Sequence, residues 1–113
     1  MADLPFSPAR EVDGWVFLAG QGGFDESGAL GDTIEAQTEQ TLRNVERLLG
    51  EHGCSMSEVV SCLVHLTDLG DFQAYNEVYA RHFAEPRPVR TTVEAKLIGA
   101  MLVEITVVAR RPG

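Results

Sequence analysis

Apolar residues recur along this chain at two spacings, one typical of helices and one typical of strands. Over positions 34 to 49 they return every three or four residues, which is the period of an amphipathic helix. Asp32, with Glu35 three residues later, is typical of a helix N-cap and its reciprocal partner. Gly50 or Gly53 can end the helix, so the pattern predicts one long helix in the first half of the chain.

A second helix is predicted in the second half. Its apolar face is mainly aromatic, and Pro86 can close the segment because proline breaks a helix. The residues on this face are Phe72, Tyr75, Asn76, Tyr79 and Phe83. We expect the rings to pack in the core, with the hydroxyl of Tyr79 alone directed toward a cleft.

Five short segments carry strand patterns instead. The first two flank Asp13-Gly14, a dipeptide suited to a tight hairpin because both positions tolerate positive φ. The segments are Ala9–Val12, Trp15–Ala19, Val59–Leu66, Val89–Ala95 and Leu102–Arg110. The order β-β-α-β-α-β-β predicts an α+β fold in a single domain spanning 1–113, with both helices on one face of a mixed sheet.

Two of these strands are apolar on both faces of the pleat, within Val59–Val64 and Leu102–Val108. The two helices can cover only one face of the sheet. A second subunit is the economical cover for the other face, so we expect a homo-oligomer.

Charge and composition narrow the possible partners. Seventeen acidic against nine basic residues give a formal net charge of −8, which repels phosphate backbones and anionic lipid. We therefore expect neither a nucleic-acid nor a membrane partner. The N-terminal segment Met1–Pro5 lacks the features of a secretory signal. Cys54 and Cys62 are then expected as reduced thiols of a cytoplasmic protein, with Cys62 facing the core.

The sequence gives no sign of a metal or a cofactor. Its three histidines, His52, His65 and His82, form no H-x-x-x-H motif and no His/Cys cluster. The glycines of Gly20–Gly23 lack the spacing of a nucleotide-binding loop. They are better suited to a tight turn or to a close approach between the main chain and a ligand.

The segment Glu85–Glu94 carries the clearest candidate for binding chemistry. Pro86 and Pro88 exclude helix there and place Arg90 on an extended strand. A guanidinium on a strand is a rigid, bidentate receptor for a carboxylate. On the segment alone, a surface arginine paired with Glu94 is the more common arrangement.

Four segments together resemble the RidA/YjgF family of reactive-intermediate deaminases. They are WVFLAGQ (Trp15–Gln21), QTEQTLRNV (Gln37–Val45), DFQAYNEVY (Asp71–Tyr79) and PVRTTVE (Pro88–Glu94), and the resemblance extends from Phe6 to Arg111. It implies a chorismate-mutase-like fold and a homotrimer whose ligand pockets lie in clefts between subunits. It also implies hydrolysis of enamine and imine carboxylates to a 2-keto acid and ammonia.

The resemblance further implies roles for individual residues. Arg90 would grip the substrate carboxylate together with the backbone N–H of Gly20. Main-chain groups at Thr92 would contact the imine end, and Asn76 and Tyr79 would lie near the pocket mouth. The substrate partner would be a small carboxylate.

Three positions depart from the family pattern. Ala19 stands where active deaminases have a serine, Phe6 where they have a tyrosine, and Thr106 where they have the glutamate that orients the attacking water. The Thr106 hydroxyl can hold a water but cannot exchange a proton near neutral pH. A β-branched strand residue chosen for packing is an equal interpretation of Thr106.

Two carboxylates lie near these positions in sequence. Glu104 shares a pleat face with Thr106, and Glu94 shares one with Arg90 and Thr92. Either could take over the water-positioning role, although a structural ion pair is the more common role for both.

Three functions remain open on the sequence. The first is an imine deaminase anchored by Arg90. The second is a related enzyme of one pathway for a bulkier imino acid, because Ala19, Phe6 and Thr106 make the pocket more apolar. The third is a non-catalytic protein that binds a small acid, which the missing glutamate favours.

Overall fold

The computed structural model describes residues 4–113; residues 1–3, part of the segment in which no export signal was expected, lie outside it. The helices and strands are β1 (Ala9–Val12), β2 (Trp15–Leu18), α1 (Ile34–Gly50), β3 (Val59–Leu66), α2 (Phe72–Ala80), β4 (Val89–Glu94) and β5 (Val103–Arg110). Short 3₁₀ turns at Met56–Glu58 and Leu69–Asp71 precede β3 and α2. The predicted element order is therefore confirmed.

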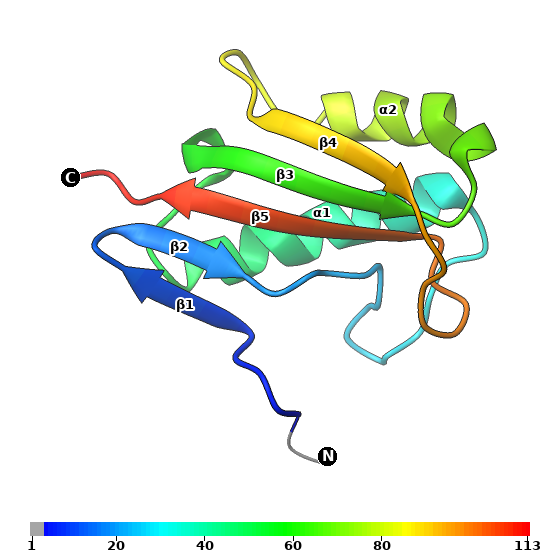
Figure 1. The fold of residues 1–113 in the computed structure, drawn as a ribbon, viewed down its shortest axis with the longest axis horizontal. Coiled ribbons are helices and arrows are strands. Elements are labelled where there is room, and N and C mark those ends of the chain that lie inside the picture. Colours follow the sequence, from blue (N-terminus) through cyan, green and yellow to red (C-terminus); the bar gives the residue numbers. More distant parts are fainter. Residues whose placement is uncertain (1–3) are drawn as a thin grey trace.

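The five strands form one mixed sheet in the order β1-β2-β5-β3-β4. Only β3 and β4 run parallel, and the other neighbours are antiparallel. Both helices cover the same face of the sheet, and α1 passes behind the sheet in Figure 1. The opposite face carries no helix and lies toward the viewer; we call it the open face. The predicted α+β architecture is confirmed. None of the helices within residues 4–113 is long and apolar enough to cross a bilayer.

The core lies between the sheet and the helices. Alternate residues of β2, β3 and β5 point into it, together with the apolar side of α1 and the rings of α2. Its most completely buried members include Val16, Leu42, Val45, Val64, Leu66, Tyr75, Val103, Ile105 and Val107. Cys54 and Cys62 are both buried free thiols, and Cys62 packs in this core as predicted.

The hairpin between β1 and β2 turns as the sequence predicts. Asp13 has a φ of 52° and Gly14 a φ of 83°, which are the two positive angles that a tight two-residue hairpin requires. This turn fixes the register in which Phe17 lies opposite Arg10. It thereby decides which β2 side chains face away from the helices.

The prediction of Asp32 as the N-cap of α1 is wrong by one residue. Thr33 takes the extended conformation of a cap, with φ −121° and ψ 159°, and its Oγ1 accepts a hydrogen bond of 3.1 Å from the backbone N–H of Ala36. The chain enters the helix only after Thr33, so Asp32 lies too far back to reach the first turn.

The predicted end of the second helix is also corrected, because α2 ends at Ala80 and not near Pro86. The backbone N–H groups of Arg81 and His82 donate to carbonyls three residues earlier, which tightens the last turn. The side chain of His82 then meets Glu39 of α1 at 2.8 Å. This contact ties the end of α2 to the first helix.

We expect Thr33→Ala to lower the free energy of unfolding by about 1 kcal/mol, because the Ala36 N–H loses its acceptor. Thr33→Ser keeps a hydroxyl in the same place and should remain close to the wild type. Urea denaturation of the three proteins measures the difference. Equal losses for the alanine and serine variants would show that the hydroxyl does not cap the helix.

The contact between His82 and Glu39, helped by Arg43, lowers the pKa of the Glu39 carboxyl. A lowered pKa stabilises the fold above the carboxyl's ordinary pKa, and this contribution is lost as pH falls through the folded-state pKa. We therefore expect Glu39→Gln to flatten the dependence of the unfolding free energy on pH between about pH 3 and 5. Denaturation at a series of pH values tests this, and parallel curves for wild type and variant would contradict it.

Candidate functional site

The residues singled out from the sequence lie on two opposite faces of the sheet. Arg90 pairs in register with Cys62 on β3, so its side chain lies on the helix-covered face. Thr106 pairs with Leu63, the next residue along β3, and therefore lies on the open face. Because side chains alternate along a strand, no rotamer change brings these two side chains together within one chain.

The guanidinium of Arg90 is held by aromatic rings of α2. Its Cζ lies 5.6 Å from the ring centroid of Phe72, 5.1 Å from that of Tyr75 and 4.7 Å from that of Tyr79. Each distance falls within the range of a cation–π contact, which stabilises the charge without consuming its hydrogen-bond donors. The predicted aromatic face of the helix thus also serves as the support of the arginine.

Open space remains beside this guanidinium. Arg90 lies at the edge of a surface depression that is lined by Asn76, Tyr79, Ala80, Arg87, Pro88 and Arg90. Among residues 4–113, none of the ion pairs involves Arg90. Asn76 also has a buried Oδ1 without a hydrogen-bond partner in this part of the chain. A half-buried, unpaired cation beside a vacant depression is suited to binding a small organic anion.

The expected pairing of Arg90 with Glu94 is not formed. Glu94 instead accepts a hydrogen bond of 2.9 Å from the backbone N–H of Leu69, in the 3₁₀ turn before α2. The carboxylate thereby closes the connection between β3 and α2. Its role in this structure is to hold the turn.

The hydroxyls behind Arg90 are buried and remain protonated. Burial raises the pKa of Tyr75 and, much more strongly, that of Tyr79. Tyr75 shares a hydrogen bond of 3.3 Å with the Thr92 hydroxyl. The Tyr79 hydroxyl points inward toward Cys62 and forms no hydrogen bond of good geometry within residues 4–113. The hydroxyl that was expected at the cleft therefore lies beneath it, while the Tyr79 ring lines the depression.

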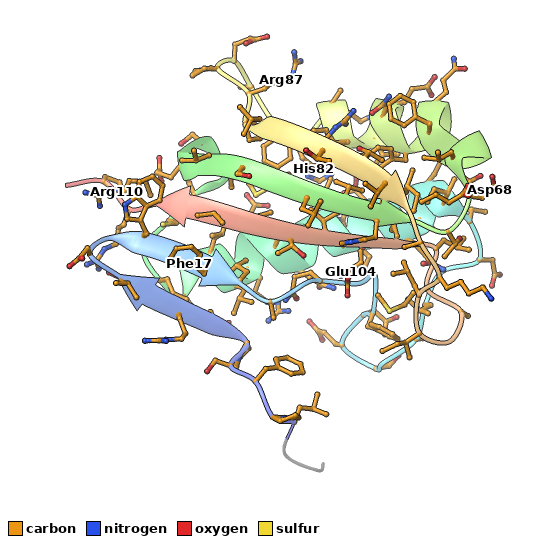
Figure 2. The ribbon with its side chains drawn as sticks, in the orientation of Figure 1. Phe17, Asp68, His82, Arg87, Glu104 and Arg110 are labelled. Atoms are coloured by element: carbon orange, nitrogen blue, oxygen red, sulfur yellow. The ribbon has the colours of Figure 1, made fainter. Side chains whose placement is uncertain are left out.

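On the open face, Gly20 lies directly against Glu104. A Cβ at position 20 would come within 2.7 Å of the Glu104 Cδ, so a larger residue there would displace the Glu104 carboxyl group. Figure 2 labels Glu104, which lies on β5. Its partner on the neighbouring strand β3 is His65. The Nδ1 of His65 is 3.7 Å from the Glu104 Oε1. Thr106 follows two residues later on the same face, so the Gly20 side of the site holds a carboxylate, an imidazole and a hydroxyl.

Ala19 precedes Gly20 in the chain, whereas Phe6 lies before β1, and the two differ in their surroundings. Ala19 lines a hollow on the open face whose wall includes Phe17, Arg10 and Val12. Phe6 is 60% exposed and is not among the residues that line the hollow. The structure therefore places Ala19 at a cavity and leaves Phe6 on the surface.

Two residues of α1 hold the loop between β2 and α1, which contains Gly20, and neither was predicted as functional. Asn44 Nδ2 donates to the carbonyl oxygens of Gly22 at 3.0 Å and Phe24 at 2.8 Å. Gln37 is 2% exposed, and its side chain donates to the Gly31 carbonyl and accepts from the Leu102 N–H. Both are polar residues on the buried side of an amphipathic helix, which is the sequence signal that could have identified them.

The two groups of residues therefore lie on opposite faces of the sheet and differ in their chemistry. Arg90 and Asn76 could anchor a carboxylate on one face. Gly20, Thr106 and Glu104 provide groups that could hold a water or an imine nitrogen on the other. The described part of the chain contains no group of three or more His, Cys, Asp or Glu side chains placed to hold a metal ion.

Comparison with known proteins gives a consistent result. Residues 1–111 match the family model described as Endoribonuclease L-PSP. A RutC family protein from Pyrococcus abyssi is 39% identical over 109 residues, which are 93% of this chain and 85% of that protein. The chloroplastic Reactive Intermediate Deaminase A of Arabidopsis thaliana is 39% identical over 92 residues, 80% of this chain and 49% of that protein. The solved structure of RidA from Psychrobacter sp. PAMC 21119 has a TM-score of 0.92 at 36% identity, covering 97% of this chain and 91% of that one.

The contacts of Asn44 give a test of how the Gly20 loop is held. Asn44→Asp keeps the shape of the side chain but removes both donated hydrogen bonds at neutral pH. We expect it to lower the free energy of unfolding by about 1–3 kcal/mol. Arg47→Ala, a change of an exposed residue on the same helix, is the matched control and should have little effect. Unfolding in urea measures the free energy of both variants. An Asn44→Asp protein as stable as the wild type would show that these hydrogen bonds do not hold the loop.

Proposed function

Because the chain belongs to the RidA/YjgF family, whose family model is described as Endoribonuclease L-PSP, we propose that it hydrolyses small enamine and imine carboxylates. The products are a 2-keto acid and ammonia. The observation that carries the proposal is Arg90, whose guanidinium forms no ion pair within residues 4–113, is supported by three rings and borders an open depression. One curated relative, from Arabidopsis, is itself named a reactive intermediate deaminase.

The proposed substrate fits the chemistry of the Arg90 side. A 2-imino acid carries a carboxylate at every pH near neutrality, so it needs a donor that stays protonated. Arginine meets this need, and its planar fork also fixes the orientation of the carboxylate. The imine carbon is bonded directly to that carboxylate, so a fixed carboxylate fixes the reacting atom as well.

The site becomes complete in an assembly of several copies. We assign the Arg90 side to one subunit and the Gly20–Thr106 side to its neighbour, in a homotrimer. The open face supports this assignment because it exposes large apolar side chains, including Phe17, Leu63 and Val93. Covering that face removes these side chains from water and brings Gly20 and Thr106 to an interface.

Binding and orientation account for part of the proposed rate enhancement. Imines hydrolyse in water without a catalyst, so holding one in place beside a water already accelerates the reaction. Thr106 can hold that water, since its hydroxyl both donates and accepts hydrogen bonds. Asn76 contributes a carboxamide at the depression beside Arg90.

RNA cleavage, which the description of the family model names, is poorly supported by the charge of this chain. The net charge of −8 opposes the approach of a phosphate backbone. The function that we assign is therefore the hydrolysis of a small molecule.

A second candidate substrate is a bulkier imino acid, and one feature favours it. The hollow beside Ala19 is lined by Phe17 and Val12, so it offers apolar space where the family's serine would be. A substrate with a larger apolar side chain would fill this space. The same Arg90 would hold its carboxylate.

We expect Arg90→Ala to lower kcat/KM for imine hydrolysis about 10- to 100-fold, the effect of removing a charged hydrogen-bond donor. The loss should fall mainly on KM, because Arg90 holds the substrate in the ground state and in the transition state alike. The assay follows loss of imine absorbance, with 2-aminoacrylate, 2-iminobutanoate and an aromatic imino acid made in situ.

Arg47→Ala is the control for this experiment, since it removes an exposed arginine of α1 that is paired with Glu51. It should hydrolyse imines at the wild-type rate. Equal rates for wild type and Arg90→Ala would refute the proposed function. A preference for the aromatic substrate would select the bulkier imino acid over the small ones.

A further inference from the structure

We propose that Glu104 is the carboxylate that activates the hydrolytic water in this chain, with His65 as its positioning residue. This inference deepens the proposed imine hydrolysis and rests on it. The need for such a group is chemical, because Thr106 occupies the position of the family's water-orienting glutamate and cannot exchange a proton near neutral pH. A base in the neighbourhood would restore this step.

The geometry points to Glu104 first because of its contact with Gly20. The Glu104 carboxyl group packs closely on Gly20, because a Cβ built at position 20 would lie 2.7 Å from its Cδ and 2.9 Å from its Oε2. The carboxylate thus lies over the loop segment to which the resemblance assigns substrate contact. It is partly exposed, at 32%, so a water can reach it from the open face.

The position of His65 also supports the role of Glu104. It lies directly opposite Glu104 in the antiparallel register of β3 and β5, and its Nδ1 is 3.7 Å from the Glu104 Oε1. This Nδ1 is buried and has no hydrogen-bond partner among residues 4–113. A small movement would let the ring donate to the carboxylate and fix its orientation.

The alternative carboxylate is already engaged. Glu94 accepts the backbone N–H of Leu69 and lies on the helix-covered face together with Arg90. Releasing it would leave that N–H without a partner. Of the two carboxylates near the site in sequence, only Glu104 therefore lies on the same face as Thr106.

Glu104 and Thr106 can both bind the same water. Residues at positions i and i+2 of a strand are separated by about 6.5 Å, which is close to the span of two hydrogen bonds to a shared water. The Thr106 hydroxyl would hold the water and Glu104 would take its proton. The substrate carboxylate would be held from the facing subunit by Arg90.

The proposed reaction balances without any further reactant. The water oxygen bonds to the imine carbon while one water proton passes to Glu104 and then to the imine nitrogen, giving a carbinolamine. Glu104 next removes the hydroxyl proton and returns it to the nitrogen. The C–N bond then breaks, a C=O bond forms and ammonia leaves, so Glu104 ends as it began.

The test compares the kinetics of four variants on 2-iminobutanoate made in situ. Glu104→Gln should lower kcat about 10²-fold or more, with KM little changed, because it removes a base and not the carboxylate anchor. Glu94→Gln is the matched control and should keep the wild-type kcat. His65→Phe should lower kcat by a smaller factor, and His65→Gln, which can still donate a hydrogen bond, should recover part of it.

Chemical rescue separates catalysis from structure. Added formate should restore part of the activity of Glu104→Ala, because a free carboxylate can enter the space left by the side chain, and it should not stimulate Arg90→Ala. Size-exclusion chromatography confirms that the variants assemble as the wild type does. A Glu104→Gln protein with wild-type kcat, or a Glu104→Ala protein that formate does not rescue, overturns the role of Glu104 but leaves the proposed function standing. A wild-type protein that does not accelerate imine loss overturns the proposed function and this inference together.

Discussion

The pleat of the sheet is the constraint on which the rest of this site depends. A strand sends alternate side chains to opposite faces, so the register of β3 with its two neighbours assigns Arg90 to the helix side and Thr106 to the open side. Within one copy of the chain, the proposed carboxylate anchor and the proposed water-holding residues therefore cannot meet. The apolar character of the open face, with Phe17 and Leu63 exposed, gives the copies a reason to associate. In the proposed trimer, assembly and activity would thus have the same physical origin.

The polar residues of the interior make this arrangement rigid. Gln37 and Asn44 hold the main chain of the loop that follows β2, so Gly20 keeps its place beneath Glu104. On the other side of the sheet, the rings of α2 hold the Arg90 guanidinium, and buried hydroxyls stand behind them. Each half of the proposed site is therefore supported by groups that lie behind it.

Much of this architecture could be predicted from the sequence because it depends on local patterns. The period of α1, the turn at Asp13-Gly14 and the extended segment around Arg90 each follow from neighbouring residues. What could not be predicted depends on distant partners. The approach of the preceding loop decides that Thr33 and not Asp32 caps α1. The cross-strand pairing of His65 with Glu104 needs a register between segments far apart in the chain, and the bond from Leu69 to Glu94 needs the parallel pairing of β3 with β4.

The burial of Cys62 beside Arg90 affects how readily its thiol reacts with electrophiles. Cys62 lies beside Arg90 in the sheet, and burial raises the pKa of its thiol although the arginine charge opposes this. A thiolate is the nucleophilic form of cysteine, so a protonated, enclosed sulfur is a poor target for alkylation. The proposed hydrolysis would bring electrophilic imines to Arg90, and a protonated, enclosed Cys62 would resist alkylation by them.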